Sequence, residues 1–292
     1  MGSGKSVFVT GGTGFVGGHL INHLQKAGYN VLRCGRPGYG KIGVHVDAVV
    51  HAAGIAHRFA EDIEYEACNH ATAALVSQAR IAGASQFVFV SSIAAQSEGV
   101  ADGTLTEESD PRPVSAYGRA KLAAEELVTR GGVPFTILRP VAISGEGAKG
   151  NTGFMQKVAK LPVPVPIGSI HARRSLVSIE SVCSAVEAVL FNEAAIGQTF
   201  IVADPEPKSA AEFITDYRKK AGRKSNVVNF PPRLLEAAFG LVGRAHMWDR
   251  INGELIADPR KLMSIGWSPA GAGVEKTSGR TSGTSGHDGA SR

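Results

Sequence analysis

The stretch that decides the fold is SVFVTGGTGFVG, residues 6–17, in which a short apolar run is followed by closely spaced glycines. The run Ser6–Thr10 predicts a buried strand, and residues 14–27 predict a helix. Glycines between a strand and a helix are typical of a dinucleotide-binding turn. Gly11 would make the tight turn, Gly14 would let a pyrophosphate approach the backbone, and Gly17 would let the helix pack on the strand. A plain glycine-rich turn is the alternative interpretation.

Beyond this turn, short apolar runs alternate with longer helical patterns. The alternation predicts an α/β fold, a doubly wound parallel Rossmann sheet with one edge strand missing or reduced and a small C-terminal lobe. Further strands are predicted at Asn30–Cys34, Ala48–His51, Phe87–Ser91 and Pro134–Leu138, and helices at Glu64–Ala82, Ala116–Thr129, Ser181–Phe191, Ala210–Ala221 and Pro232–Gly243.

The expected division of the chain follows from a change of pattern after Pro140, where glycine- and proline-rich stretches begin. Residues 1–140, with contributions from 170–205, are expected to form the dinucleotide-binding domain, and residues 141–269 a substrate-binding lobe. Residues 270–292 consist largely of Gly, Ser and Thr, and we expect them to be disordered because they offer little apolar surface to bury.

The missing edge strand is predicted from the interval between Cys34 and Asp47, which is rich in glycine. A helix, a strand and a second helix would need about 30 residues, since each crossover takes at least about 10–12. The interval is therefore expected to run as a loop over the carboxyl edge of the sheet to the strand at Ala48. The strand at Asn30–Cys34 would then lie at the edge.

Composition excludes several classes of protein. The 292 residues are 43% hydrophobic and 20% charged, so a sizeable core can form. The net charge of +5 is spread without a long basic run, and we therefore expect no nucleic-acid partner. Three widely spaced cysteines predict neither a disulfide scaffold nor a metal site. No apolar run resembles a signal peptide or a membrane span, which favours a cytoplasmic protein.

A second pattern, Tyr117-Gly118-Arg119-Ala120-Lys121, indicates acid–base chemistry. Tyr117 and Lys121 are four residues apart and would project from one helix face. An ammonium beside a phenol is expected to lower the pKa of the phenol toward that of a general base. Ser92, which follows a predicted strand, could hydrogen-bond the same substrate oxygen. A Y-x-x-x-K pair alone is often a solvated helix face, and the glycine turn and Ser92 favour the catalytic interpretation.

Together these motifs resemble the extended short-chain dehydrogenase/reductases, in the NAD-dependent epimerase/dehydratase family. The resemblance covers about residues 5–269 and rests on the motifs TGGTGFVG (10–17), DAVVHAAG (47–54), VFVSSI (88–93), YGRAK (117–121), LRP (138–140), RRSLVSIESV (173–182) and IGWSP (265–269), together with Asn69. Within the family the chain is most similar to bacterial UDP-sugar 4-epimerases and to 4-keto-sugar reductases of polysaccharide biosynthesis.

The resemblance implies roles for matching positions. The implied catalytic residues are Ser92, Tyr117 and Lys121. The implied cofactor-binding residues are Gly11, Thr13, Gly14, Phe15, Val16, Gly17, Arg36, Ala52, Ala53, Gly54, Asn69, Tyr117, Lys121, Pro140 and Val141. The implied substrate-binding residues are Ser92, Asn151 and Arg174, the last two at the sugar-nucleotide diphosphate. For Arg174 a solvated surface position is the alternative, and for Asn69 a buried amide that bends its helix.

Two departures from the family bear on the cofactor, expected to be NAD(P). Gly35 stands where an NAD-preferring enzyme carries an acidic residue that hydrogen-bonds the ribose 2′-hydroxyl, and Arg36 follows it. A glycine beside an arginine can accommodate a 2′-phosphate, so the sequence favours NADP. The short interval before Asp47 also lacks the acidic strand end that lies against the adenine in relatives. We therefore expect the adenine to be more exposed than in relatives.

The predicted function is that of an NAD(P)-dependent nucleotide-sugar epimerase, resembling UDP-glucose 4-epimerase, that transfers hydride at C4 of a UDP-hexose. One alternative is an NADPH-dependent 4-keto nucleotide-sugar reductase, which uses the same three residues. Another is a non-catalytic NADP-binding regulator or decayed enzyme, which the missing edge strand favours and the intact Ser92, Tyr117 and Lys121 oppose. The resemblance also implies a possible homodimer through helices 64–82 and 116–129.

Overall fold

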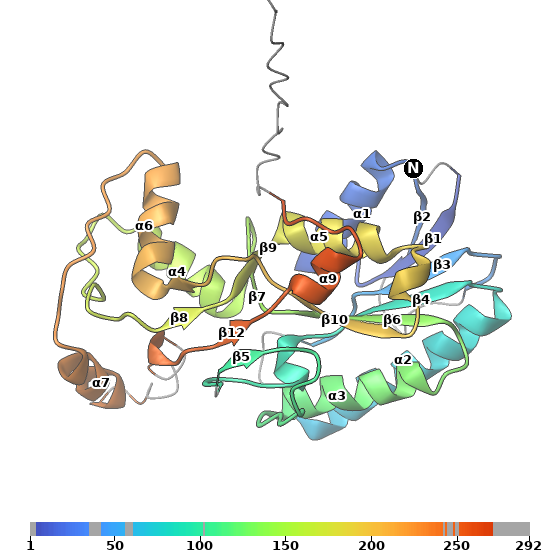
Figure 1. Ribbon diagram of the computed structural model, residues 1–292, viewed down its shortest axis with the longest axis horizontal. Helices are drawn as coiled ribbons and strands as arrows, with labels where there is room; N and C mark the ends of the chain where they lie inside the picture. The colour runs from blue at the N-terminus through green and yellow to red at the C-terminus, as the bar shows by residue number, and fades with distance from the viewer. Residues whose placement is uncertain are drawn as a thin grey trace, which may run out of the picture.

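A six-stranded parallel sheet forms the centre of the computed structural model (Figure 1), which describes residues 4–34, 42–55, 61–101, 103–241, 243, 248 and 251–270. The strand order is β10-β6-β4-β3-β1-β2, and every neighbouring pair is parallel. The strands are β1 (Ser6–Thr10), β2 (Asn30–Arg33), β3 (Ala48–His51), β4 (Gln86–Val90), β6 (Phe135–Pro140) and β10 (Gln198–Val202). The predicted fold class is confirmed.

Helices cover both faces of this sheet, which is why its central strands are apolar throughout. On one face lie α1 (Phe15–Lys26) and α5 (Ile179–Val189), and on the other α2 (Asp62–Ile81) and α3 (Ala116–Thr129) (Figure 1). Each face has its own apolar cluster. Leu20, Leu24 and Val186 are fully buried in the first, and Leu75, Phe87 and Ile137 in the second.

A smaller group of elements lies beside the carboxyl edge of the sheet (Figure 1). It contains α4 (Gly150–Lys160), α6 (Ala210–Lys220) and α7 (Pro232–Leu241), with β8 (Arg173–Arg174) paired to β11 (Lys208–Ser209). A small third cluster around Ile214 holds α4 and α6 together. The remaining elements are η1 (Ile93–Ala95), η2 (Glu193–Ala195), α9 (Arg260–Ser264) and two short strand pairs, β7 (Ala142–Ser144) with β9 (Leu176–Ser178) and β5 (Thr104–Leu105) with β12 (Ile256–Ala257).

The edge of the sheet agrees with the prediction, and the described end of the segment after β2 leads into β3 at the opposite edge. Among the described residues, β2 pairs only with β1. Residues 42–46 pack on the end of α2, where Ile42 N donates to Gln78 Oε1 (3.0 Å) and Val46 N donates to Ala82 O (3.4 Å). That part of the loop therefore lies at the amino edge of the sheet, because the parallel strand β3 has to begin there. Residues 35–41 lie outside the described residues.

Two further expectations concern the ends of the molecule and membranes. The expected disorder of residues 270–292 falls outside the described residues except for residue 270. None of the described helices has the length and apolar character needed to cross a bilayer.

Candidate functional site

The glycine turn joins β1 to α1 at the carboxyl edge of the sheet, as predicted. Gly11 has a φ of +76°, which L side chains rarely adopt, and a Cβ there would lie 2.8 Å from the backbone of Ala52. A Cβ on Gly17 would lie 2.2 Å from Gly11 O. Only glycine therefore lets the turn lie against the end of β3 and lets α1 pack against the turn.

The N-terminus of α1 is open toward the same edge. Its N-cap is Gly14, whose N–H donates to Gly11 O (2.8 Å), and no described side chain caps the helix. Thr13 and Gly14 are exposed, and Phe15 and Val16 are half-buried. Backbone N–H groups at a helix N-terminus, with no competing carboxylate in the first turn of this helix, are a favourable environment for a pyrophosphate. The residues at this turn thus fit a dinucleotide.

A buried histidine that was not predicted from the sequence contacts the residue before the glycine turn. His51, the last residue of β3, is 1% exposed. Its Nδ1 is hydrogen-bonded to Thr10 Oγ1 (2.6 Å) and its Nε2 to Thr72 Oγ1 (3.0 Å). Burial, and secondarily the charge of Lys121, lower the pKa of His51 to about 3. A neutral imidazole therefore connects the residue before Gly11 to α2.

Ser92, Tyr117 and Lys121 come together at this edge. Ser92 follows β4, and its hydroxyl is hydrogen-bonded to the hydroxyl of Tyr117. Tyr117 and Lys121 lie on successive turns of α3, and Lys121 Nζ donates to Val90 O (3.1 Å) above the ring of Phe89. The phenol, the serine hydroxyl and the ammonium thus lie around the end of β4.

The electrostatics of the pair differ from the sequence-based expectation. Burial raises the pKa of Tyr117 to about 12, and the hydrogen bond from Ser92 only partly opposes this. The expected lowering by Lys121 is not found, because burial dominates and Lys121 Nζ is directed at Val90 O. Burial also lowers the pKa of Lys121 to about 8, against the nearby charge of Glu125. At neutral pH the phenol is therefore protonated and Lys121 is mostly cationic.

The start of α3 is fixed by two contacts that place Tyr117. Ser115 caps the helix by accepting from Gly118 N (2.9 Å), and the carboxylate of Glu98 accepts from both Ser115 N and Ser115 Oγ (2.8 Å each). A Cβ on Gly118 would lie 2.3 Å from Ala94 O. Gly118 therefore lets α3 approach the turn that Ser92 begins.

Most of the other expected cofactor residues lie near this group. Ala52 and Ala53 follow β3 and are half-buried, and a Cβ on Gly54 would lie 3.3 Å from Lys121 Nζ. Pro140 and Val141 are buried at the end of β6. Asn69 is half-buried on α2, one turn after Tyr65, whose ring centroid is 6.4 Å from that of Tyr117. Arg36 and Gly35 lie outside the described residues.

The two expected substrate residues lie on different elements. Asn151 is exposed in the first turn of α4. Arg174, on β8, is half-buried, and its Nη1 donates to Gly99 O (2.7 Å) and Gly253 O (2.8 Å). Arg174 therefore holds two loops together.

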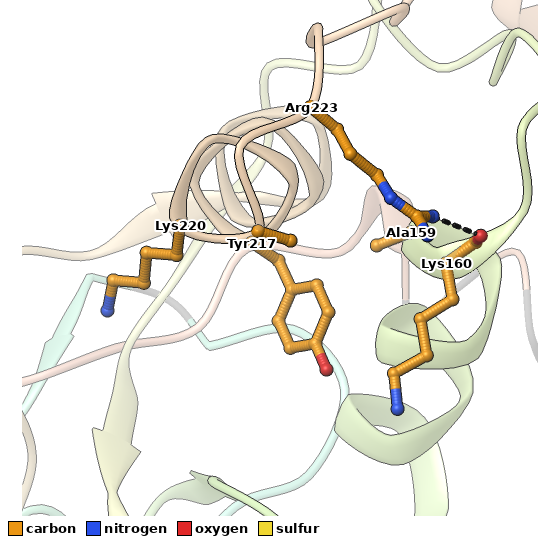
Figure 2. A pocket seen from close by; sticks show the side chains of 6 residues that line it. Ala159, Lys160, Tyr217, Lys220 and Arg223 are labelled. Atoms are coloured by element: carbon orange, nitrogen blue, oxygen red, sulfur yellow. Dashed lines mark hydrogen bonds between the residues drawn. The ribbon is translucent and has the colours of Figure 1, made fainter.

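A hollow between α4 and α6 is separate from this group of residues. Figure 2 shows its lining, which consists of Ala159, Lys160, Tyr217, Lys220, Ala221 and Arg223. Its cations lie at or just beyond the C-terminal turns of the two helices, where positive charge is favoured. Lys160 ends α4 and Gly150 begins it, so the hollow lies about 15 Å from the N-terminus of this helix at a rise of about 1.5 Å per residue. The charges of this hollow are explained by helix termination.

Comparison with known proteins agrees with the fold and the turn. The model of the NAD dependent epimerase/dehydratase family matches residues 7–203, and the chain belongs to this family. A UDP-glucose 4-epimerase from Vibrio cholerae is 29% identical over 298 residues, with 91% of each chain covered. A 4-hydroxy-2-methyl-3-oxo-4-farnesyl-3,4-dihydroquinoline-1-oxide ketoreductase from Stigmatella aurantiaca is 26% identical over 266 residues, covering 79% of this chain and 78% of the relative.

Solved structures show the same fold at lower identity. A UDP-glucose 4-epimerase from Thermotoga maritima, determined with UDP-glucose, has a TM-score of 0.69 and 20% identity, covering 91% of this chain and 94% of that one. A human epimerase family protein with NADPH has a TM-score of 0.70 and 20% identity, covering 91% and 95%. With the family match, these findings define an NAD(P)-dependent enzyme of the epimerase and oxidoreductase class.

Proposed function

We propose that this protein is a nucleotide-sugar epimerase that acts at C4 of a UDP-hexose. The observation that carries the proposal is the meeting of Ser92, Tyr117 and Lys121 beside an open helix N-terminus. A hydroxyl, a phenol and an ammonium suit a substrate whose alcohol becomes a ketone. The likeness to the epimerase from Vibrio cholerae over 91% of both chains supports a UDP-hexose as the substrate.

The proposed roles follow from the position of each group. Tyr117 takes the proton of the 4-hydroxyl and returns it when the ketone is reduced, and Ser92 hydrogen-bonds the same oxygen. The high pKa of Tyr117 favours proton return, whereas proton removal requires positive charge close to the phenol. We assign this positive charge to Lys121, because it lies one helical turn after Tyr117 and is mostly charged at neutral pH.

The proposed cofactor contacts lie along the carboxyl edge of the sheet. Gly11, Thr13, Gly14, Phe15, Val16 and Gly17 would hold the pyrophosphate. Ala52, Ala53, Gly54, Asn69, Lys121, Pro140 and Val141 would surround the nicotinamide half. When bound, NAD(P) accepts and returns the hydride. The preference for NADP remains a prediction from Gly35 and Arg36.

Proposed substrate contacts come from the elements beside the sheet. Asn151 lies in the first turn of α4, where its side-chain amide would hydrogen-bond the diphosphate of the substrate. Arg174 would supply positive charge toward the same diphosphate. We also propose that residues 1–140, with contributions from 170–205, form the dinucleotide-binding domain and that the rest of residues 141–269 forms the substrate-binding lobe. A homodimer through α2 and α3 is a further proposal from the resemblance.

A 4-keto-sugar reductase is the second candidate function. The ketoreductase relative from Stigmatella aurantiaca, which matches 79% of this chain, favours it. The two functions differ in what happens to the cofactor. An epimerase leaves the cofactor unchanged after each turnover, whereas a reductase consumes one NADPH for each ketone reduced.

The experiment that tests the site compares Tyr117→Phe with Tyr217→Phe, a tyrosine in the separate hollow between α4 and α6. Loss of the Tyr117 hydroxyl should reduce conversion of UDP-glucose about 10²–10⁴-fold, the usual contribution of general acid–base catalysis. Tyr217→Phe should retain the wild-type rate. Near wild-type conversion by Tyr117→Phe would disprove the assignment of this residue as the base.

A further inference from the structure

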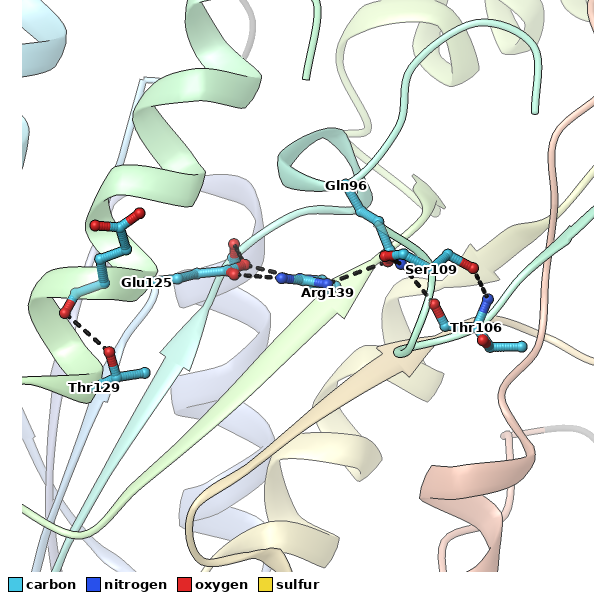
Figure 3. Close-up of polar contacts among 8 residues, drawn as sticks. Gln96, Thr106, Ser109, Glu125, Thr129 and Arg139 are labelled. Atoms are coloured by element: carbon cyan, nitrogen blue, oxygen red, sulfur yellow. Dashed lines mark hydrogen bonds and ion pairs between the residues drawn. The ribbon is translucent and has the colours of Figure 1, made fainter. Parts of the chain in front are cut away.

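A buried ion pair lies directly behind the proposed site. Glu125 on α3 is 4% exposed and Arg139 on β6 is 6% exposed. Arg139 Nη2 donates to Glu125 Oε2 (2.6 Å) and Arg139 Nε donates to Glu125 Oε1 (3.0 Å), so both carboxylate oxygens are engaged (Figure 3). A two-point contact of this kind fixes both distance and orientation.

Further hydrogen bonds extend the pair to the turn that carries Ser92. Ser91 Oγ donates to Glu125 Oε1 (2.5 Å), and Arg139 Nη1 donates to Gln96 Oε1 (3.2 Å). Figure 3 shows Gln96 and Arg139 connected in this way. Gln96 in turn donates to the backbone carbonyls of Thr106 (2.5 Å) and Ser109 (2.8 Å). The network therefore joins α3, β6 and the residues on both sides of Ser92.

We propose that the Glu125–Arg139 pair is a positioning element of the site, which sets the spacing of Lys121, Ser92 and Pro140 by joining the three segments that carry them. Glu125 lies one helical turn after Lys121, Ser91 precedes Ser92, and Arg139 precedes Pro140. The inference rests on the proposed function for the roles of these three residues. The pair itself contacts neither substrate nor cofactor in this proposal.

Burial makes positioning a better account of the pair than stability. Removing two charges from water is costly, and replacement of a buried pair by residues of similar volume is often neutral for stability. A surface pair at the C-terminal end of the same helix provides the contrast. Glu126 and Arg130 are 58% and 80% exposed, and their charged atoms are 3.6 Å apart.

The pair also acts on Lys121 through charge. Glu125 is the largest influence that raises the pKa of Lys121 against burial, and Cys68 on α2 contributes less. The other titratable groups around the ammonium are His51 on β3, which is neutral, and Tyr117 on α3, which is protonated. Removal of the Glu125 charge should therefore make Lys121 more often neutral at pH 7, and so more reactive toward amine reagents.

The test compares Glu125→Gln/Arg139→Met with the matched surface variant Glu126→Gln/Arg130→Met. The first should fold, because both members of the pair are removed together, Lys121 can become neutral, and the introduced amide can still accept from Ser91. Its kcat for UDP-hexose conversion should fall about 10-fold or more, since small displacements of reacting groups are costly. Competitive acetylation read by mass spectrometry should show faster labelling of Lys121 at pH 7. The surface variant should change neither quantity.

Each outcome decides the inference. A folded buried-pair variant with unchanged kcat would overturn it, whatever the labelling of Lys121, while leaving the proposed function intact. If the wild type converts no UDP-hexose, the proposed function fails, and unchanged labelling of Lys121 in the buried-pair variant would then by itself overturn the inference. If the double variant does not fold, Arg139→Lys decides, because lysine retains the charge but cannot bridge Glu125 and Gln96 with a planar fork. Arg139→Lys should lower kcat, and an unchanged kcat would overturn the inference.

Discussion

Replacement of His51 by glutamine should make the stability of this protein less sensitive to acid. The neutral imidazole lies between Thr10 and Thr72, and burial lowers its pKa from 6.5 to about 3. Between these two values the unfolded chain binds a proton that the folded chain does not, so stability falls as the pH falls through this window. Thr10 directly precedes the glycine turn at Gly11, which makes the measurement relevant to the cofactor site.

The size of the effect follows from the two pKa values. From pH 7 to pH 5, protonation of His51 in the unfolded chain should cost about 2 kcal/mol of stability, and by pH 4 about 3 kcal/mol, at about 1.4 kcal/mol per pH unit below 6.5. A glutamine at this position cannot titrate, so the variant should lack this part of the acid sensitivity.

Urea unfolding of the wild type, His51→Gln and His70→Gln at pH 7, 5 and 4 measures the effect. His70 is an exposed residue of α2, so its variant should follow the wild-type dependence on pH. The comparison uses the change with pH within each protein, because His51→Gln also alters hydrogen bonding at pH 7. Equal pH dependence in the wild type and His51→Gln would refute the argument.

Three other substitutions test close approaches and cofactor choice. Gly17→Ala places a Cβ 2.2 Å from Gly11 O and should weaken NAD(P)H binding more than about 10-fold in a fluorescence titration. The control Gly18→Ala, whose Cβ would lie 3.5 Å from Gly12 O, should bind NAD(P)H as the wild type does. Equal binding by both variants would contradict the packing argument. Gly118→Ala places a Cβ 2.3 Å from Ala94 O and should cost about 1–3 kcal/mol in urea unfolding, and no loss would show that α3 can move away. Gly35→Asp should shift affinity from NADP toward NAD, and an unchanged NADP affinity would mean that Gly35 does not lie at the ribose.

Local patterns were sufficient to predict the glycine turn and five of the six strands of the sheet. Strand β1 and helix α3 begin and end at the predicted residues, because a buried apolar run and a Ser-capped helical pattern are both encoded within a few positions. Strand β10 was not predicted as an element. Its five residues, Gln198–Val202, form a strand because β6 offers them a partner about 60 residues earlier in the chain.

The supporting residues of the site depend on contacts that sequence spacing does not reveal. Thr10 and His51 are 41 residues apart, and Gln96 and Arg139 are 43 apart. For the same reason the sequence suggested that Lys121 lowers the pKa of Tyr117, whereas the fold directs its ammonium at Val90 O. Arg174 likewise has contacts with loops about 75 residues away in either direction.

The central claim, that this chain interconverts C4 epimers of a UDP-hexose, is tested most directly by proton NMR of the anomeric region together with absorbance at 340 nm. Purified protein with UDP-glucose and catalytic NAD(P) should produce the 4-epimer at equilibrium with no net formation of NAD(P)H. Production of a reduced sugar from a 4-keto substrate, with one NADPH consumed for each molecule and no interconversion of UDP-glucose, would contradict the epimerase and favour the reductase. Absence of both reactions and of NAD(P)H binding would contradict the proposed site itself.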